Sequence, residues 1–163
     1  MRDRAVPHQP TIELKVLDAR LDDWGPPAYQ SDMAAAIDLR AAIDAPLSIG
    51  AGSPAVLVPS GLALFIRDPF VAAMILPRSG LGHKTGLVLG NSTGLIDADY
   101  LGPILVSVWN RNPPGTPPIA IEPGDRIAQM VFVPVVRPRF ERVTAFSAET
   151  TRGAGGFGST GGK

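Results

Sequence analysis

The sequence predicts an all-β protein, a jelly-roll-like β-barrel subunit with one short helix. Its 163 residues include 18 Gly and 17 Pro, roughly a fifth of the chain, and this content opposes long helices. About ten short apolar runs separated by turn residues fit strands joined by turns. Because neither an internal repeat nor an interdomain linker is visible, we expect one β domain over residues 1–148 and a flexible arm over residues 149–163.

Composition excludes several classes of protein. Apolar residues make up 45% of the chain and charged residues 18%, as in ordinary globular domains. The formal net charge of zero argues against nucleic acid as a partner. The absence of cysteine excludes disulfides, thiolate chemistry and cysteine-based zinc sites. The chain has no signal-peptide-like start and no run of about 18 apolar residues, so we expect no membrane partner and a cytoplasmic location.

Hydrophobic patterning locates the strands of the first half. Residues 11–16 alternate apolar and polar side chains, which predicts a half-buried strand. Residues 18–29 contain Gly25-Pro-Pro27 and are expected to form a loop. Further strands are predicted at residues 34–41, 46–49, 55–58, 62–66 and 72–76, with a turn at 59–61.

Ser79 is predicted to cap the one short helix, which Gly86 would end. A longer strand follows at residues 103–109, where Trp109 is assigned to the core. The last predicted strands are 119–122 and 127–136, after a proline-rich turn at 112–118.

Residues 86–102 predict a β-hairpin with a possible function. A short apolar strand leads into a glycine-bounded turn, and the return strand carries Asp97, Asp99 and Tyr100. Residues two apart on a strand point to one face, so the carboxylates would share a face, with Tyr100 on the other. The Asn91 amide can donate and accept hydrogen bonds along one flat edge, much as a nucleobase does. This pattern indicates a candidate site; the alternative is a tight turn whose acids only support its backbone.

The chain ends in a glycine-rich segment that contains Arg152, Phe157, Ser159 and Thr160. Such a segment cannot bury enough apolar surface to order itself, so we expect it to be mobile until a ligand binds. It lacks the Gly-x-x-x-x-Gly-Lys-Ser/Thr pattern of a phosphate-binding loop.

Five motifs, in order and over roughly residues 11 to 161, resemble those of the homotrimeric deoxyuridine triphosphatase (dUTPase) family. They are Ala36-Ile-Asp38-Leu-Arg-Ala41, Pro77-Arg-Ser-Gly-Leu81, Gly94-Leu-Ile-Asp97-Ala-Asp-Tyr100-Leu-Gly102, Pro123-Gly-Asp-Arg-Ile-Ala-Gln129 and Arg152-Gly-Ala-Gly-Gly-Phe157-Gly-Ser-Thr-Gly161. The resemblance implies a jelly-roll-like homotrimer with sites between subunits. It also implies Mg²⁺-dependent hydrolysis of dUTP to dUMP and pyrophosphate, which keeps uracil out of DNA and supplies dUMP for thymidylate synthesis.

The resemblance assigns Asp97 as the general base. Phosphoanhydride hydrolysis needs a positioned water and a group that accepts its proton, and the matching acid of the family prepares the water that attacks the α-phosphorus. Asp99 is expected to have a structural role. An isolated acid in a glycine-rich hairpin would more often only support the turn.

The resemblance also assigns the residues that select the nucleoside. Asn91 and the backbone of Gly94, Leu95, Ile96 and Asp97 would bind uracil and leave no room for the methyl group of thymine. Tyr100 would pack against deoxyribose and exclude a ribose 2′-hydroxyl, and Leu105 belongs to the same substrate-binding set. Without the motif, Tyr100 would be an ordinary strand aromatic.

The phosphates are assigned to residues of the second and fourth motifs. A guanidinium such as that of Arg78 binds two oxygens at once, and backbone N–H groups at a helix start attract anions; Ser79 and Gly80 occupy that position. Gln129 would add a hydrogen bond, while Asp125 and Arg126 are expected to pair with each other. Asp38 matches the family acid that holds Mg²⁺ through water, with substrate phosphates as its main ligands.

In the family, the C-terminal arm closes over the bound nucleotide. The resemblance implies that Phe157 stacks on uracil, and such stacking is worth roughly 1–3 kcal/mol. Arg152, Ser159 and Thr160 would contact the phosphates, and Gly158 belongs to the same substrate-binding set. Arm closure would exclude water other than the nucleophile.

Two other functions compete with this assignment. The related deoxycytidine triphosphate deaminase, or its bifunctional form, shares the fold but needs a glutamate at the hairpin, and residues 86–102 contain none. A trimeric nucleotide-binding module without catalysis is the alternative of another class; the presence of Asp97, Arg78 and Arg152 argues against it.

Overall fold

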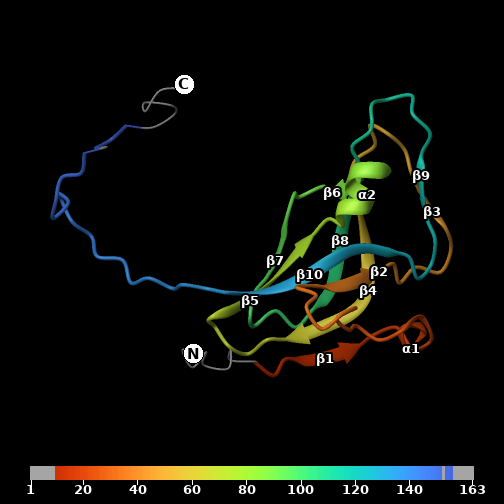
Figure 1. Ribbon diagram of the computed structural model, residues 1–163, viewed down its shortest axis with the longest axis horizontal. Helices are drawn as coiled ribbons and strands as arrows, with labels where there is room; N and C mark the ends of the chain where they lie inside the picture. The colour runs from red at the N-terminus through yellow and green to blue at the C-terminus, as the bar shows by residue number, and fades with distance from the viewer. Residues whose placement is uncertain (1–9, 152, 156–163) are drawn as a thin grey trace.

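The structure, a computed structural model, describes residues 10–151 and 153–155 and confirms the all-β class (Figure 1). Its described part contains ten strands and two short helices. These elements are β1 (Glu13–Val16), α1 (Arg20–Trp24), β2 (Ile37–Arg40), β3 (Leu47–Ile49), β4 (Val56–Phe65), β5 (Val71–Leu76), α2 (Ser79–Lys84), β6 (Leu87–Leu89), β7 (Gly94–Ile96), β8 (Pro103–Asn110), β9 (Ile119–Ile121) and β10 (Arg126–Pro134).

The strands form three antiparallel sheets. The first sheet has the order β1-β4-β8-β6, the second has the order β2-β10-β5-β7, and β3 pairs with β9 in a small third sheet. Strands that are neighbours in a sheet are mostly distant in sequence, as the crossing ribbons in Figure 1 show. The second sheet matters most for function, because its strands carry three of the five motifs.

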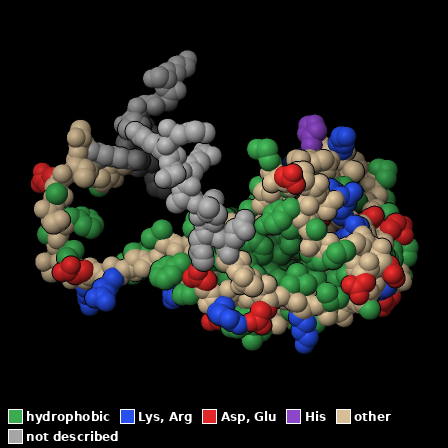
Figure 2. Space-filling view, turned by 60° about the horizontal axis from the view of Figure 1, so that its bottom comes forward, with side chains coloured by type: hydrophobic (Ala, Val, Ile, Leu, Met, Phe, Trp, Pro, Cys, Tyr) green, Lys and Arg blue, Asp and Glu red, His purple; other side chains and the backbone are tan. Residues whose placement is uncertain are grey.

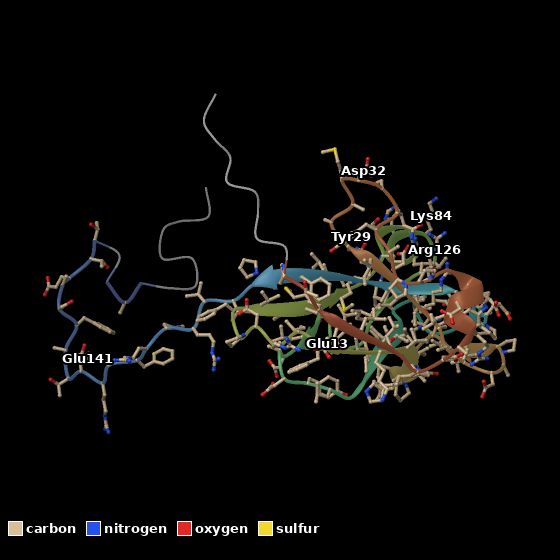
Figure 3. The ribbon with its side chains drawn as sticks, turned by 90° about the horizontal axis from the view of Figure 1, so that it is seen from below. Glu13, Tyr29, Asp32, Lys84, Arg126 and Glu141 are labelled. Carbon is tan, nitrogen blue, oxygen red and sulfur yellow. The ribbon has the colours of Figure 1, made fainter. Side chains whose placement is uncertain are left out.

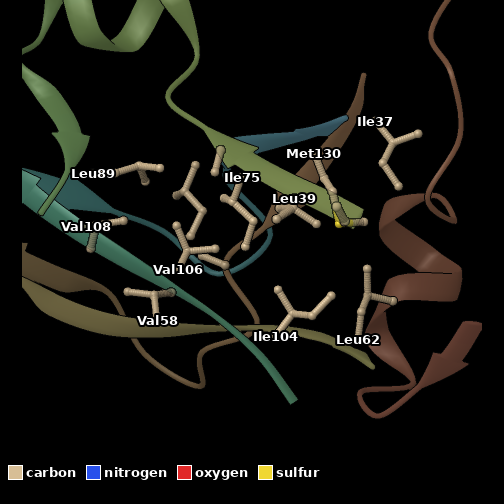
Figure 4. Close-up of a cluster of buried hydrophobic side chains, with 14 of the residues drawn as sticks. Ile37, Leu39, Val58, Leu62, Ile75, Leu89, Ile104, Val106, Val108 and Met130 are labelled. Carbon is tan, nitrogen blue, oxygen red and sulfur yellow. The ribbon is translucent and has the colours of Figure 1, made fainter. Parts of the chain in front are cut away.

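Side chains from both four-stranded sheets meet in one core (Figure 4). Strand β8 alternates strictly, so that Ile104, Val106 and Val108 are at most 1% exposed. They pack with residues of the opposite sheet such as Leu39 and Met130, both fully buried. Full burial of each such side chain is worth about 1.5–3 kcal/mol. This core fixes the strand ends from which the functional loops emerge.

Strand β4 corrects the prediction of two strands separated by a turn. Residues 56–65 form one strand, and residues 59–61 are an irregularity within it, where the register with β8 shifts between Pro59 and Ala63. The carbonyl oxygen of Pro59 accepts a hydrogen bond from Ala42 N at 2.8 Å, and that of Gly61 accepts one from Leu17 N at 2.7 Å. A bulge of this kind bends a strand without ending it.

Helix α1 corrects the prediction of a loop over residues 18–29 and of only one helix. Leu21 is 2% exposed and packs in the core, so tertiary burial stabilises a turn that local propensity does not favour. Asp18 supports its start, because Oδ1 accepts a hydrogen bond from Arg20 N at 3.0 Å. Gly61 leaves room for this packing, since an added Cβ there would lie 2.9 Å from Leu21 Cδ1.

The prediction of a hairpin over residues 86–102 is also wrong, because the two strands of this segment, β6 and β7, do not pair with each other. Strand β6 pairs with β8 in the first sheet, whereas β7 pairs with β5 in the second, so the segment crosses from one sheet to the other. Strand β7 ends at Ile96, and Asp97 and Asp99 lie in the following turn. The two-residue strand period therefore does not determine where these carboxylates point.

Strand β1 was predicted to be half-buried, but all four of its residues are exposed in the single chain. Trp109 is 38% exposed and donates its indole N–H to the Ser53 carbonyl oxygen at 3.1 Å, so its assignment to the core was wrong. None of the helices in the described ranges is long and apolar enough to cross a membrane.

Beyond β10, Val135 N still donates to the Phe70 carbonyl oxygen at 2.7 Å, and the residues from 138 to 151 then run away from the sheets as an extended segment (Figures 1 and 2). The apolar side chains of Val136, Phe140 and Phe146 are 87–91% exposed. The predicted domain boundary at residue 148 stays a prediction. Five residues that were predicted to bind substrate lie outside the described ranges: Arg152, Phe157, Gly158, Ser159 and Thr160.

Candidate active site

Most of the residues assigned to the nucleoside line one hollow of about 200 Å³. Leu95, Ile96 and Asp97 come from β7 and the turn that follows it. The hollow is lined by Leu57, Leu95, Ile96, Asp97, Tyr100, Pro103 and Leu105. Its walls are mainly apolar with one carboxylate, which suits a flat ligand carrying a polar reacting group.

Tyr100 is fixed by its own loop. Its hydroxyl donates to the Pro103 carbonyl oxygen at 3.0 Å, and its backbone N–H donates to the Asp97 carbonyl oxygen at 3.2 Å. Gly102 is required beside the ring, because an added Cβ would lie 2.5 Å from the Tyr100 hydroxyl oxygen. Tyr100 is 43% exposed, so part of its side chain remains accessible to a ligand.

Asn91 lies in the turn before β7 and is exposed, but it is not among the residues that line the hollow. Close packing explains the glycines on both sides of this turn. An added Cβ at Gly94 would lie 3.0 Å from the Ile75 Cβ, so β7 approaches β5 closely there. At Gly90, an added Cβ would collide with Ala55.

A second polar cluster lies at the other end of the β2-β10-β5-β7 sheet. Arg78 Nε is 2.8 Å from Asp38 Oδ1, and Arg126 Nη1 is 3.2 Å from Asp38 Oδ2. The Asp38 carboxylate is therefore shared by two guanidinium groups, and its side chain is 15% exposed. Arg126 does not pair with Asp125 as predicted, because Asp125 Oδ2 accepts a hydrogen bond from Glu122 N at 2.8 Å.

Gln129 connects this cluster to the end of β5. It lies opposite both Asp38 and Leu76 in the sheet, and its Nε2 donates to the Pro77 carbonyl oxygen at 3.0 Å. This hydrogen bond fixes the chain immediately before Arg78. Figure 3 shows Arg126 of this cluster far along the molecule from Glu141 of the extended segment.

Helix α2 was predicted correctly, but its cap was not. Arg78 is the N-cap residue, with extended backbone angles, and no side chain caps the helix. Ser79 is already helical and exposed, as is Gly80, where an added Cβ would meet no atom within 4 Å. The helix ends at Lys84, and Gly86 follows with a φ of 83°.

The register of the second sheet separates these two clusters. Asp97 follows Ile96, which lies opposite Ala73, whereas Arg78 is five residues further along from Ala73. At ~3.3 Å per residue, the two backbone positions are on the order of 15–20 Å apart. Asp38 on β2 lies at the opposite edge of the sheet from β7, three strand spacings or roughly 14 Å away.

The sequence did not indicate two features of these clusters. The fourth motif contains Arg126, but its partner Asp38 lies 88 positions away, and no local signal marks Leu57 of β4, which forms part of the wall of the hollow. Both contacts depend on strands that are distant in sequence. A metal-binding group of three or more His, Cys, Asp or Glu side chains is absent from the described part of the chain.

The fold places the chain in the class of all-β proteins, and comparison with known proteins identifies the family. The family model described as dUTPase matches residues 22–161. The deoxyuridine 5′-triphosphate nucleotidohydrolase of Pasteurella multocida is 56% identical over 151 residues, which cover 92% of this chain and 97% of that protein. The protein of the same name from Xanthomonas campestris pv. campestris is 54% identical over 152 residues, covering 93% and 97%.

Solved structures agree with this result. A mutant dUTPase of Staphylococcus bacteriophage 80alpha, solved with dUpNHpp, matches with a TM-score of 0.80 at 25% identity, over 94% of this chain and 99% of that one. A mutant dUTPase from phage phi11 of S. aureus, described with a structural Mg(II) ion, shares the fold with a TM-score of 0.74 at 22% identity, over 85% and 99%. The chain belongs to the dUTPase family.

Proposed function

We propose that this chain hydrolyses dUTP to dUMP and pyrophosphate. Membership of the dUTPase family and relatives at over 50% identity support this activity. The observation that carries the proposal is the position of Asp97 at a hollow with Leu95, Tyr100 and Leu105, the residues assigned to the nucleoside. An acid at the rim of such a hollow can act on the phosphate nearest the sugar. The expected cytoplasmic location belongs to the same proposal.

Asp97 is the proposed general base. Its carboxylate accepts a proton from a water molecule as the water oxygen forms a bond to the α-phosphorus. The bond from the α-phosphorus to the bridging oxygen breaks, and pyrophosphate leaves with that oxygen. In this arrangement Tyr100 packs against the deoxyribose, and the backbone of Gly94–Ile96, together with Asn91, contacts the base.

The second cluster is the proposed phosphate site. Its proposed ligands are Arg78, Ser79, Gly80 and Gln129, and Gln129 Nε2 also donates to the Pro77 carbonyl oxygen at 3.0 Å. A guanidinium offers paired N–H groups to phosphate oxygens. Because Arg78 uses Nε for Asp38 and Nη1 for the Arg126 carbonyl oxygen at 3.4 Å, Nη2 is the terminal nitrogen that would meet a phosphate first.

Mg²⁺ fits this cluster only when it is bound through water and substrate. Both oxygens of Asp38 are paired with arginines, and no carboxylate cage surrounds them in the described residues. Mg²⁺ retains several waters and binds substrate phosphates, so Asp38 would contact its water shell. When bound, the ion neutralises charge on the phosphates. This chain's own residues hold the phosphates and remove the proton.

The distance between the clusters supports sites formed by more than one copy of the chain. The backbones of Asp97 and Arg78 in one chain are on the order of 15–20 Å apart, which favours a phosphate site supplied from a second copy. A neighbouring copy can supply the second cluster, and closed rotational symmetry repeats this contact at every interface. We therefore propose a homotrimer, in which the arm residues Arg152, Phe157, Gly158, Ser159 and Thr160 complete the site.

A pyrophosphate-release assay with Mg²⁺ tests the proposed activity. Purified protein is given dUTP, dCTP, dTTP and UTP separately, and the base of each product is identified. We expect rapid release from dUTP alone. Release of uracil products from dCTP would indicate the deaminase alternative, and binding of dUTP without release would indicate the non-catalytic module. Equal rates on dTTP or UTP would contradict selection by the hollow.

A further inference from the structure

Arg67 has a backbone conformation that residues with a Cβ rarely adopt. Its φ is 68°, and among the described residues only Ser92 is another non-glycine residue with a positive φ. The Asp68 N–H donates to the Ile66 carbonyl oxygen at 2.8 Å and closes a three-residue turn around Arg67. Such a conformation persists only where surrounding contacts determine it, and it is enriched at functional sites.

The unusual conformation aims the backbone N–H of Arg67 at the loop that carries the proposed base. This N–H donates to the Ala98 carbonyl oxygen at 3.0 Å. Ala98 directly follows Asp97, inside the turn that the hydrogen bond from Tyr100 N to the Asp97 carbonyl oxygen closes. The hydrogen bond from Arg67 therefore ties this turn to the connection between β4 and β5.

The Arg67 side chain anchors the residue from the other direction. Its guanidinium forms an ion pair with Glu13 of β1, which is labelled in Figure 3. It also lies over the ring of Phe65, 5.3 Å from the centroid. Glu13 and Phe65 are direct partners in the β1–β4 ladder. These contacts hold the side chain on the first sheet while the backbone reaches the turn after β7.

We infer that Arg67 is a positioning residue for Asp97. Its left-handed backbone fixes the Ala98 carbonyl group and with it the direction of the neighbouring carboxylate. Arg67, Asp97 and Asp99 also line one hollow of about 430 Å³, separate from the hollow assigned to the nucleoside. This inference rests on the proposed function, because it assumes that Asp97 accepts the proton.

Three substitutions separate the backbone conformation from the side chain. R67G, R67A and R67V all remove the guanidinium, but glycine adopts a positive φ freely, alanine less so and a β-branched residue least. We expect kcat to follow the order R67G, R67A, R67V. R67G should stay within about threefold of the unmodified enzyme, and R67V should lose roughly tenfold or more with KM changed less than about threefold, as for a small misplacement of a catalytic group. If R67V does not fold, the comparison of kcat between R67G and R67A still tests the expected order.

Gly115→Val provides the matched control. Gly115 has a φ of 91° in the proline-rich turn, and an added Cβ there meets no atom within 4 Å. This variant introduces the same kind of backbone strain far from Asp97, so it should lower the melting temperature and leave kcat unchanged.

Hydrogen exchange supplies a readout that is independent of activity. Slow exchange at the Arg67 amide in the unmodified enzyme, and equally slow exchange at residue 67 in R67G, are expected. Equal kcat values for R67G and R67A, or fast exchange at the Arg67 amide, would overturn the inference. If the unmodified enzyme still hydrolyses dUTP in that case, the proposed function stands. An unmodified protein that releases no pyrophosphate from dUTP would instead remove the proposed function itself.

Discussion

Arg78 Nε lies 2.8 Å from Asp38 Oδ1, so a proposed phosphate ligand is held in place by a carboxylate before any phosphate is bound. The second oxygen of the same carboxylate lies 3.2 Å from Arg126 Nη1. Asp38 thus keeps two guanidinium groups close together at the end of the sheet. Without this anion their mutual repulsion would spread the cluster apart.

Asp38→Asn is expected to lower kcat/KM for dUTP by about two orders of magnitude, since an amide neither neutralises the two guanidinium groups nor orders the water shell of Mg²⁺ as well as a carboxylate does. The Mg²⁺ concentration that gives half the maximal rate should rise. Asp44→Asn is the control, because Asp44 is 96% exposed and pairs only with Arg20 among the described residues. An unchanged Mg²⁺ requirement in Asp38→Asn would show that Asp38 does not contact the ion's water shell.

Tyr100 should determine the choice between deoxyribose and ribose. Tyr100→Ala opens the hollow beside the sugar, and we expect the ratio of kcat/KM for dUTP to that for UTP to fall by roughly tenfold or more. Tyr100→Phe keeps the ring and loses only the hydrogen bond to Pro103, so it should retain most of the discrimination. Equal discrimination by the Ala variant and the unmodified enzyme would assign the sugar preference elsewhere.

Removal of two fully buried polar side chains, those of Ser60 and Asn110, is expected to change the free energy of unfolding in different ways. The Ser60 hydroxyl is 0% exposed and has no hydrogen-bond partner within the described ranges. The Asn110 amide is equally buried, donates to Ile49 O at 3.0 Å and accepts from Asn112 N at 3.0 Å. Urea unfolding should show Ser60→Ala to be neutral or stabilising by up to about 1 kcal/mol, and Asn110→Ala to be destabilising by about 2–3 kcal/mol. Destabilisation of similar size in both variants would reveal a partner for Ser60.

Asp18 gives the stability a dependence on acid pH. The Arg20 side chain donates hydrogen bonds to its carboxylate, at 2.5 Å from Nη2, and this holds the pKa of Asp18 below its ordinary value of 3.8. A lowered folded-state pKa stabilises the protein above 3.8, and the contribution is lost as the pH falls through the folded-state value. At fixed protein concentration, the difference in urea midpoint between the unmodified protein and Asp18→Asn should narrow below pH 3.8. A difference in urea midpoint that stays constant as the pH falls below 3.8 would contradict the stabilising pair of Asp18 and Arg20.

Local patterns predicted much of the fold, because alternation and turn residues act within a few positions. The buried side chains of β8 and the helix after Pro77 follow from such patterns. Helix α1 could not be predicted in this way, since the burial of Leu21 against distant elements stabilises it. Likewise, the separate sheets of β6 and β7 depend on pairing partners that the segment itself does not encode.

The residues of the site were predicted only in part, because local motifs identify residue types but do not show which distant residues meet. The motifs indicated which residue types serve the base and the phosphates, and the structure gathers Leu95, Ile96, Asp97, Tyr100 and Leu105 in one hollow. The contact between Arg126 and Asp38 and the wall formed by Leu57 come from long-range strand order. The separation of the clusters along β5 also required the observed register.

A subunit-mixing experiment can test whether the nucleoside hollow and the phosphate cluster of one site come from different chains. Asp97→Asn chains carry an intact phosphate cluster, and Arg78→Ala chains carry an intact nucleoside hollow. If each site combines one cluster from each of two chains, random mixing of the inactive proteins restores about one quarter of the sites, since each intact half is present with a probability of about one half. Asp38→Asn mixed with Arg78→Ala is the control, because both lesions lie in the same cluster.

Pyrophosphate release from dUTP by the Asp97→Asn and Arg78→Ala chains, unfolded together and refolded as a mixture, tests most directly whether the site is shared. We expect activity near one quarter of the unmodified enzyme, from parents that are each nearly inactive. Activity no higher than the average of the two parents, in a mixture shown to contain mixed trimers, would contradict a site built from two chains.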